Sequence, residues 1–497
     1  MPELVLAIDA GTTGIAALVL DGDATERGRA YSEFTQHYPK PGWVEHDAQE
    51  IWDTTRDMMV RALEDADVGP EDIAAIGITN QRETTVVWDR TTSQPVAPAI
   101  VWQCRRSTPI CERIKSEGLE EEVRARTGLV VDPYFSATKL MWYLEQLDGI
   151  RASAEEGRLA FGTIDTWLIW NLTGGETHVT EPSNASRTML YSLASRAWDE
   201  WILERLGVPA PLLPEVVPSS GRFGETAPAV LGRPVPISGA AGDQQAALFG
   251  QACFEVGMAK NTYGTGSFVL MNTGETAPTS THGLLSTAAW DAGAGFRFAL
   301  EGSIFITGAA VQWLRDGLGI IARSADTEEL ASTVPDAGGT YLVPAFVGLG
   351  APHWDPYARG AYLGITRGTT KAHLARAAVE AMAYQTRDVV EAMEADCGVK
   401  LAELRVDGGA SVMDLLCRFQ ADQLGVVVRR PANLETTALG AAYLAGLAEG
   451  VWSSADEIAR SWTAGAEFEP TMSRDEADAR HARWKEAVSR AKSWEPR

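Results

Sequence analysis

The sequence predicts an α/β protein made of two large domains. Short apolar segments typical of buried strands alternate with helical segments, and several of these strands run directly into glycine-containing turns. The length of 497 residues exceeds what one hydrophobic core usually organises. We therefore place residues 1–250 in an N-terminal domain and residues 251–497 in a C-terminal domain.

Composition and charge limit the classes of function. The chain is 45% hydrophobic and 22% charged, as in ordinary globular proteins, and its formal net charge is -24. This acidic balance argues against a nucleic-acid partner or an anionic membrane surface, because both are bound through clustered Lys and Arg. A nucleotide ligand is still allowed, since backbone N–H groups and Mg²⁺ can hold phosphates.

Cysteine and histidine patterns point to a cytoplasmic protein without a zinc site. The five cysteines form no C-x-x-C pair, which predicts reduced thiols. The seven histidines lack the H-x-x-H and H-E-x-x-H spacings of zinc ligands. The first residues do not resemble a signal peptide, and no run approaches roughly 18 apolar residues, so we expect no integral membrane segment.

Residues 4–20 predict a hairpin of two buried strands around the polar loop Asp9-Ala-Gly-Thr-Thr-Gly14. Consecutive N–H groups and the hydroxyls of Thr12 and Thr13 can bind phosphate oxygens in such a loop, while Asp9 holds Mg²⁺. An ordinary hairpin turn is the alternative interpretation, because Asp, Gly and Thr are common turn residues.

Candidate substrate residues follow the next strand. The strand at 73–79 leads into Arg82 and Glu83, and ligands of open α/β sheets bind at such strand ends. The two side chains can donate to and accept from the hydroxyls of a small polyol, and the alternative is a surface ion pair. Trp102 and Tyr134 are candidates for a pocket wall, although core packing is the ordinary fate of such aromatics.

The stretch Ile237–Gly250 lies at the middle of the chain. It predicts an apolar strand that breaks at two glycines and resumes as a small-residue helix starting near Asp243. A carboxylate at a glycine-flanked turn can approach a substrate closely, so we predict that Asp243 is a catalytic base. Helix capping is the alternative role for an aspartate at this place.

The second half repeats the pattern of the first. Residues 258–271 predict another hairpin around a Gly/Thr loop, which suggests an internal duplication, and the strand at 404–407 ends in a glycine turn suited to a planar base. A helix at 304–318 carries Gly308 and Gln312 on one face. Further helices are expected at 48–65, at 372–396, 414–424 and 436–449, which complete the C-terminal α/β domain, and at 475–494, which is amphipathic.

These loops, in this order, resemble the actin, hexokinase and heat-shock ATPase superfamily, in which two ribonuclease-H-like domains enclose ATP in an interdomain cleft. Over nearly its whole length the chain resembles the FGGY carbohydrate kinases, on Tyr134-x-Ser-x-x-Lys139-Leu-x-Trp142 and on Gly360–Arg367 with His373–Glu380. Further segments resemble the members of that family that phosphorylate glycerol: Pro39–Asp47, Gly77–Thr85, Ile100–Arg106, Asn261–Gly266 and Gly350–Gly360.

The resemblance implies transfer of the γ-phosphoryl group of ATP to glycerol. It implies that Asp243 takes the hydroxyl proton and that Mg²⁺ lies beside Asp9 and Asp243. It places glycerol against Arg82, Glu83, Trp102, Tyr134, Asp243, Gln244 and Phe268. It places the nucleotide against Thr12, Thr13, Gly14, Thr265, Gly308, Gln312, Gly409 and Met413. The family often forms dimers or tetramers, so we expect a homo-oligomer.

Some residues depart from the family pattern. Gly14 and Ala16 stand where bacterial relatives usually have serine and arginine, and Met413 stands where asparagine is usual. The segment before Pro234 lacks the patterns of a fructose-1,6-bisphosphate site and of a phosphorylated histidine. Two alternatives stay open: a kinase of another small polyol or ketose, and a kinase-like protein that binds ligands without turnover.

Overall fold

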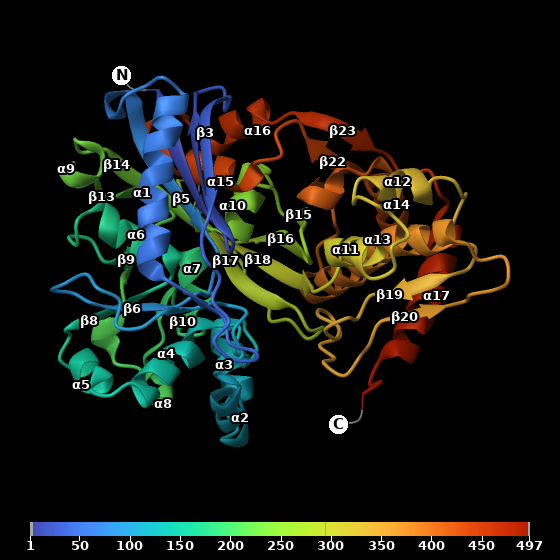
Figure 1. Cartoon of the computed structure of the whole chain (residues 1–497), viewed down its shortest axis with the longest axis horizontal. Coiled ribbons are helices and arrows are strands. Elements are labelled where there is room, and N and C mark those ends of the chain that lie inside the picture. The colour runs from blue at the N-terminus through green and yellow to red at the C-terminus, as the bar shows by residue number, and fades with distance from the viewer. Residues whose placement is uncertain (1–2, 294, 496–497) are drawn as a thin grey trace.

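Two mixed β-sheets dominate the computed structural model, which describes residues 3–293 and 295–495. The blue-to-green part of the chain lies on the left of Figure 1, and the yellow and orange part lies on the right. The red helices α15 (Thr436–Glu449) and α16 (Ala455–Ser461) lie on the left, beside the N-terminal sheet. The predicted α/β class is confirmed. The chain passes back to the N-terminal half at α15 and α16, and its C-terminal end lies with the other half.

The N-terminal sheet has six strands in the order β13-β14-β5-β1-β2-β3. The predicted hairpin is confirmed, because β1 and β2 pair antiparallel, while β5 runs parallel to β1 and β14 runs parallel to β5. The bounds are β1 Leu4–Ala10, β2 Gly14–Leu20, β3 Glu26–Glu33, β5 Ile73–Asn80, β13 Ser220–Glu225 and β14 Pro236–Gly242.

The C-terminal sheet has seven strands in the order β17-β18-β16-β15-β21-β22-β23. Its predicted hairpin is also confirmed, because β15 and β16 pair antiparallel, and β21 runs parallel to β15. The bounds are β15 Met258–Tyr263, β16 Ser267–Gly274, β17 Leu285–Ala292, β18 Gly295–Ile304, β21 Glu403–Asp407, β22 Val428–Pro431 and β23 Ala464–Phe468.

The two sheets share one pattern of neighbouring strand directions, although β17 and the two edge strands come at different points of the chain order. In the first, an antiparallel β3-β2-β1 meander continues through the parallel strands β5 and β14 to the antiparallel edge strand β13. In the second, β18-β16-β15 continues in the same way through β21 and β22 to β23. The agreement of neighbouring strand directions supports the predicted internal duplication.

The strand β1 is apolar from Leu4 to Ile8 because both faces of its sheet are covered. Leu6 and Ile8 pack in a hydrophobic cluster with helix α1 (Ala48–Asp65), and Val5 and Ala7 pack in another cluster with α15. The second cluster also contains residues of β16 in the C-terminal sheet. The helix α15 therefore joins the cores of the two halves.

The helices α10 (Asp243–Gly250) and α15 cross at very short range. A Cβ atom on Gly250 would lie 1.9 Å from the carbonyl oxygen of Thr436, and one on Gly440 would lie 1.9 Å from that of Ala246. A side chain at either position would force the two backbones apart, so glycine is required at this crossing.

Two predictions about mid-chain elements are wrong. The strand that we expected to break at its glycines continues through Gly239 to Gly242, and Gly239 instead allows α15 to approach, since its Cβ would lie 2.4 Å from the Ala445 nitrogen. The helix expected from Ile304 begins later, because β18 extends to that residue and α11 spans Gly308–Asp316.

The other helix predictions agree closely with the structure. The helices α1, α14 (Asp414–Leu424) and α15 have the predicted bounds, and α13 (Lys371–Cys397) and α17 (Arg474–Ala491) cover most of the ranges expected for them. The role given to α15 is wrong, because it packs on the N-terminal strands β1, β5 and β14. The division of the chain at residue 250 stays a prediction.

Smaller elements complete the fold. Those between β3 and β14 are β4 Glu45–His46, η1 Pro70–Asp72, β6 Val86–Asp89, β7 Ala99–Ile100, α2 Thr108–Ser116, α3 Glu120–Thr127, α4 Ser136–Gln146, α5 Ile150–Glu155, β8 Leu159–Gly162, α6 Ile164–Leu172, β9 Val179–Thr180, α7 Pro182–Ala185, β10 Tyr191–Ser192, β11 Ala197–Trp198, α8 Glu200–Leu206, η2 Ala210–Leu212, β12 Glu215–Val216 and α9 Pro228–Leu231. Those of the second half are α12 Asp326–Ala331, β19 Tyr341–Val343, β20 Ala361–Leu363 and η3 Gly409–Val412.

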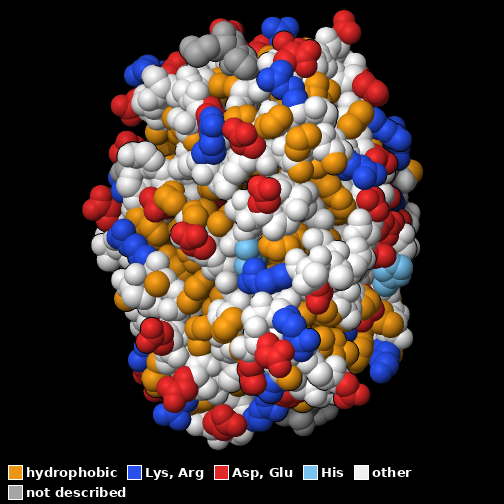
Figure 2. Space-filling view, turned by 90° about the vertical axis from the view of Figure 1, so that its left-hand side faces the viewer, with side chains coloured by type: hydrophobic (Ala, Val, Ile, Leu, Met, Phe, Trp, Pro, Cys, Tyr) orange, Lys and Arg blue, Asp and Glu red, His pale blue; other side chains and the backbone are white. Residues whose placement is uncertain are grey.

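The surface carries both signs of charge. On the face shown in Figure 2, Lys and Arg side chains are interspersed with Asp and Glu side chains and with apolar groups. Among the helices of the described residues, none has the length and apolar character needed to cross a membrane.

Candidate active site

Arg82 is the centre of a group of side chains contributed by both halves of the chain. It lies just after β5 and is only 3% exposed. Its Nε lies 3.1 Å from Asp243 Oδ1, and its Nη1 and Nη2 lie 2.5 and 3.1 Å from the two carboxylate oxygens of Glu301. Because Glu301 belongs to β18, the position of this guanidinium depends on both sheets.

Asp243 is the first residue of α10, and Gly242 before it occupies the N-cap position. The side chain of Asp243 makes no capping bond to the helix beyond the N–H of Gln244, so the capping alternative does not describe it. The carboxylate is about a third exposed, at 31%. Gly242 gives Arg82 the space to reach it, because a Cβ there would lie 2.6 Å from Arg82 Cγ. Asp243 is therefore both held in place and accessible.

Glu83 is buried and does not form the surface ion pair that we considered. Its carboxylate lies 3.9 Å from Arg82 Nε, and instead its Oε1 accepts a 2.6 Å hydrogen bond from Arg187 Nε. The backbone of Glu83 has a φ of 61°, a left-handed conformation that is unusual for a residue with a side chain. Such strain is often found at functional sites.

Aromatic rings lie beside these charges. The ring centroids of Trp102 and Tyr134 are 5.6 Å apart, and Phe268 lies 5.8 Å from the guanidinium carbon of Arg82. All three residues are partly exposed, and each also packs against a hydrophobic core cluster. The indole of Trp102 donates a 3.0 Å hydrogen bond to Thr12 Oγ1, which connects the aromatic group to the first glycine loop.

Gln244 is oriented by a buried lysine. Lys260 Nζ donates to Gln244 Oε1 and, at 2.9 Å, to Thr262 Oγ1. Burial lowers the pKa of Lys260 to about 8. Because the amide oxygen is occupied by Lys260, the NH₂ group of Gln244 is the end left to donate to a ligand.

The second glycine loop is joined to the start of α11. The carbonyl oxygens of Gly264 and Thr265 accept hydrogen bonds of 3.0 Å from the N–H groups of residues 307–309. Gly308 must be glycine here, because its Cβ would lie 2.5 Å from the Gly264 oxygen. Gln312 is exposed one turn further along α11. Thr265, Gly308 and Gln312 are thus brought together, as expected for one binding surface.

The third glycine turn lies against the second. Gly408 has a φ of 81°, and a Cβ there would lie 2.6 Å from the carbonyl oxygen of Tyr263. Gly409 has open space beside it, whereas Met413 is buried in the C-terminal core. The side chain of Met413 is thus occupied by packing, so any nucleotide contact of this residue falls to its backbone.

The first glycine loop presents Thr13 to solvent at the end of β1. Gly14 is buried at the start of β2, where a Cβ would lie 2.7 Å from the Ser32 carbonyl oxygen and from the Tyr31 hydroxyl. Packing against β3 therefore accounts for the glycine at this position, where a serine would not fit without movement.

Asp9 and Asp243 are close enough to affect each other. Burial, followed by the charges of Asp243 and Glu435, raises the pKa of Asp9 to about 7. Two carboxylates that repel each other fit a divalent cation, and Mg²⁺ needs only one or two carboxylates when nucleotide phosphates supply further ligands. Within residues 3–293 and 295–495, no group of three or more His, Cys, Asp or Glu side chains could hold a metal ion by itself.

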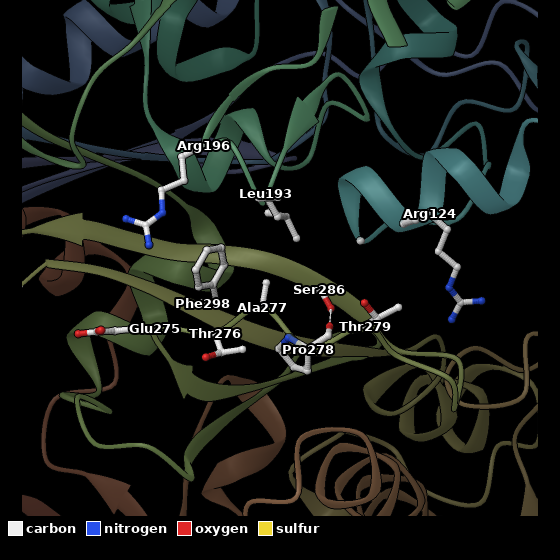
Figure 3. Close-up of a pocket in the computed structure, with 13 residues that line it drawn as sticks. Arg124, Leu193, Arg196, Glu275, Thr276, Ala277, Pro278, Thr279, Ser286 and Phe298 are labelled. Atoms are coloured by element: carbon white, nitrogen blue, oxygen red, sulfur yellow. Dashed lines mark hydrogen bonds between the residues drawn. The ribbon is translucent and has the colours of Figure 1, made fainter. Parts of the chain in front are cut away.

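A separate pocket of about 350 Å³ lies away from these residues (Figure 3). It is formed by the α3 segment, the loop at 193–196 and residues of β17, β18 and the 275–279 segment. In Figure 3, Arg124 and Arg196 lie at opposite ends of it, and Ser286 bonds to Pro278 between them. None of the predicted site residues lines this pocket.

Part of the charged group is not predicted from the sequence. Its members are Arg187, Gln245, Lys260 and Glu301, all of which touch a predicted substrate residue. Lys260 follows the apolar pair Met258-Ala259, and Glu301 follows the apolar run Phe298-Ala-Leu300. This is the available signal, since a charge in a buried strand needs a partner. Arg187 lies in an irregular segment without such a pattern.

Comparisons with known proteins identify the family. Residues 4–250 match the FGGY family of carbohydrate kinases, N-terminal domain, and residues 259–449 match the C-terminal domain of that family. The sequence is 60% identical to a glycerol kinase of Carboxydothermus hydrogenoformans over 99% of both chains. The chain belongs to the FGGY family of carbohydrate kinases. This FGGY kinase is also 59% identical to glycerol kinase 2 of Thermotoga maritima over 100% of both chains.

Solved structures agree with this assignment. The FGGY kinase resembles the crystal structure of Plasmodium falciparum glycerol kinase with ADP, with a TM-score of 0.92, 34% identity and 98% of each chain covered. It also shares its fold with gluconate kinase from Lactobacillus acidophilus, with a TM-score of 0.88 at 20% identity over 98% of this chain and 97% of the other. The predicted fold of two ribonuclease-H-like, actin-like ATPase domains is thereby confirmed.

Proposed function

We propose that this FGGY kinase transfers the γ-phosphoryl group of ATP to a terminal hydroxyl of glycerol, giving sn-glycerol 3-phosphate and ADP. The observation that carries the proposal is the buried contact network in which Arg82 joins Asp243 and Glu301 beside Glu83. A neutral polyol can be distinguished from other ligands only by fixed donors and acceptors, which such a network provides. The 60% and 59% identical relatives are named glycerol kinases.

Glycerol recognition uses complementary groups gathered around Arg82. Arg82 and the Gln244 amide donate hydrogen bonds, and the carboxylate of Glu83 accepts one. The rings of Trp102, Tyr134 and Phe268 cover the carbon backbone of the substrate. Each polar group is already bonded on its other side by the protein, so little ordering is needed when glycerol binds.

Asp243 acts as the general base in this proposal. As the hydroxyl oxygen forms its bond to the γ-phosphorus, the hydroxyl proton passes to Asp243 and the bond from γ-phosphorus to the bridging oxygen of ADP breaks. Arg82 Nε, 3.1 Å from Asp243 Oδ1, orients the carboxylate. Such a transfer depends on alignment and charge neutralisation more than on covalent chemistry.

The glycine loops bind the nucleotide. Thr12, Thr13, Gly14 and Thr265 contact phosphates, and Gly308, Gln312, Gly409 and Met413 contact the nucleoside. Asp9 and Asp243 are the residues that would hold Mg²⁺, which would neutralise charge on the phosphate oxygens. The charge of Asp243 acts on Asp9, and a bound cation would relieve the repulsion between the two carboxylates.

The cellular setting and assembly are part of the proposal. The protein is cytoplasmic, which is supported by five free cysteines, four of them buried. It forms a homo-oligomer, either a dimer or a tetramer, as FGGY members often do. Analytical ultracentrifugation of the purified chain tests the assembly, and a single species of 53.5 kDa would contradict it.

Steady-state kinetics on the purified chain test the activity. ADP release with ATP and Mg²⁺ is measured with glycerol, with other small polyols and with ketoses, and we expect glycerol to give the highest kcat/KM. ADP release that glycerol does not increase contradicts the proposal. A higher kcat/KM for a ketose favours the alternative substrate class. Tight glycerol binding in calorimetry, with turnover no faster than that of an Asp243→Asn variant, favours a binding protein.

A further inference from the structure

Four buried charges form a closed network beside the proposed substrate site. Arg82 and Arg187 are 3% and 0% exposed, and Glu83 and Glu301 are 1% and 0% exposed. Arg187 Nε donates to Glu83 Oε1 at 2.6 Å, and Arg187 Nη2 donates to Glu301 Oε1 at 3.1 Å. Glu301 also binds both terminal nitrogens of Arg82. The network is electrically balanced, with two positive and two negative groups.

Stability alone does not account for this network. Two ion pairs removed from water cost desolvation that their attraction barely repays, and apolar side chains of similar size are often as stable or better. In addition, the buried Nη1 of Arg187 has no hydrogen-bond partner among the described residues. An arrangement that stabilises the fold so poorly is better explained by what it does to Glu83.

We propose that Arg187 is a positioning residue of the active site, which fixes the carboxylate of Glu83 so that its second oxygen accepts a hydrogen bond from a substrate hydroxyl. The inference rests on the proposed function, because it takes Glu83 as a substrate contact. Arg187 occupies Oε1, and no hydrogen bond within the described residues reaches Oε2. The guanidinium carbon of Arg187 also lies 5.4 Å from the ring of Tyr134, so Arg187 supports the aromatic wall as well.

The surroundings of Glu83 make this role measurable. The titratable and charged groups that face it are Arg82, Tyr134, Lys139, Arg187 and Glu301. Burial raises the pKa of Glu83, and Arg187 followed by Arg82 opposes that rise. Without Arg187 the carboxyl group would hold its proton to a higher pH, and a protonated carboxyl would present a donor where the substrate needs an acceptor.

The experiment compares glycerol KM and kcat from pH 6 to pH 9 in the wild type, Arg187→Met, Arg187→Lys and the double variant Arg187→Met/Glu83→Gln. We expect Arg187→Met to raise KM about 10- to 100-fold near neutral pH, as for loss of a charged hydrogen bond, with a smaller change in kcat. The ratio of this KM to the wild-type KM should fall as pH rises, because the protonated Glu83 of the variant loses its proton at higher pH. Arg187→Lys should recover part of the loss, since it keeps the charge.

The double variant and a matched control separate positioning from folding. Arg187→Met/Glu83→Gln removes one charge of each sign, so it leaves no unpaired carboxylate, and the ratio of its KM to the wild-type KM should not change with pH. Arg376→Met removes an arginine paired with Glu380 on α13 and should leave KM unchanged. The thermal midpoint of each variant is measured, and if Arg187→Met does not fold, Arg187→Lys and the double variant carry the comparison.

Two results would overturn the inference. The first is a glycerol KM equal to that of the wild type across the pH range in Arg187→Met, or in Arg187→Lys if Arg187→Met does not fold. The second is a ratio of variant to wild-type KM that still depends on pH in the double variant. Failure of the proposed function is seen separately, as a wild-type protein that does not phosphorylate glycerol.

Discussion

Asp243 Oδ1 lies 3.1 Å from Nε of Arg82, and the other nitrogens of the same guanidinium are held by Glu301. The carboxylate proposed as the base is therefore oriented by an arginine that has itself no freedom to turn. A base held in this way needs little rearrangement before proton transfer.

Asp243→Asn should lower kcat by about 10²-fold or more, the usual scale for loss of a positioned base, with a smaller effect on glycerol KM. Asp456→Asn is a matched control, because it changes an aspartate in the first turn of α16, away from the site, and should leave kcat unchanged. The role of Asp243 would be refuted by a variant that keeps the wild-type kcat.

Arg82→Ala should weaken glycerol binding and also destabilise the protein. It removes a donor from the site, and among the described residues it leaves buried Glu301 with Arg187 as its one ion-pair partner. Breaking a buried ion pair of this kind costs about 3–5 kcal/mol. Glycerol KM and the denaturant midpoint are measured together, and an unchanged KM in a folded variant would exclude Arg82 from the substrate site.

Trp102→Phe should raise the KM for ATP about 2- to 10-fold, because the indole N–H no longer holds Thr12 of the first glycine loop. The control is Trp198→Phe, in which the lost indole bond goes to the Pro214 carbonyl oxygen instead. Equal ATP KM values in the two variants would show that the Trp102 bond does not order the loop.

Gly440→Ala should destabilise the fold by about 1–3 kcal/mol, because the added Cβ would lie 1.9 Å from the Ala246 carbonyl oxygen and push α15 away from α10. Gly22→Ala is the control, since nothing lies within 4 Å of a Cβ there. The midpoint of urea unfolding reports the difference. Equal midpoints would mean that the helix crossing adjusts without cost.

Glu301 should make stability fall with acidification in a defined window. Burial raises the pKa of Glu301, but Arg187 and Arg82 outweigh this and hold the pKa at about 2, below the ordinary value of 4.5. The unfolded chain thus takes up this proton first, so the contribution is fully present above about pH 4.5 and is lost as pH falls toward 2. Unfolding free energies are measured from pH 6 to pH 3, and their slope against pH gives the number of protons taken up on unfolding. That number should be about one smaller in Glu301→Gln than in the wild type. Identical slopes would contradict this origin.

Much of the fold could be predicted because its signals are local. The glycine loops between apolar strands of both hairpins, and the helices α1, α14 and α15, follow from patterns within short windows of sequence. The place of α15 could not be predicted in this way. The small residues on its surface would allow it to pack on either sheet. Contacts between residues distant in sequence, such as that of Gly239 with Ala445, determine that it packs on the N-terminal sheet.

The candidate site could likewise be predicted only in part. Arg82, Glu83 and Asp243 could be picked out because each follows a predicted strand that ends in a turn. Arg187 could not, because it lies in an irregular segment and its partner Glu83 is more than a hundred residues away in sequence. Glu301 carries only the signal of a charge inside a strand, and in the structure it holds the guanidinium of Arg82 in position.

The placement of α15 has a consequence for biosynthesis. During translation, the strands of the first sheet leave the ribosome long before residues 436–449 are made, so one apolar face of that sheet waits without its cover. A fragment ending near residue 250 should for this reason aggregate when expressed alone. It should become soluble when a separate chain that carries the rest of the sequence is produced beside it.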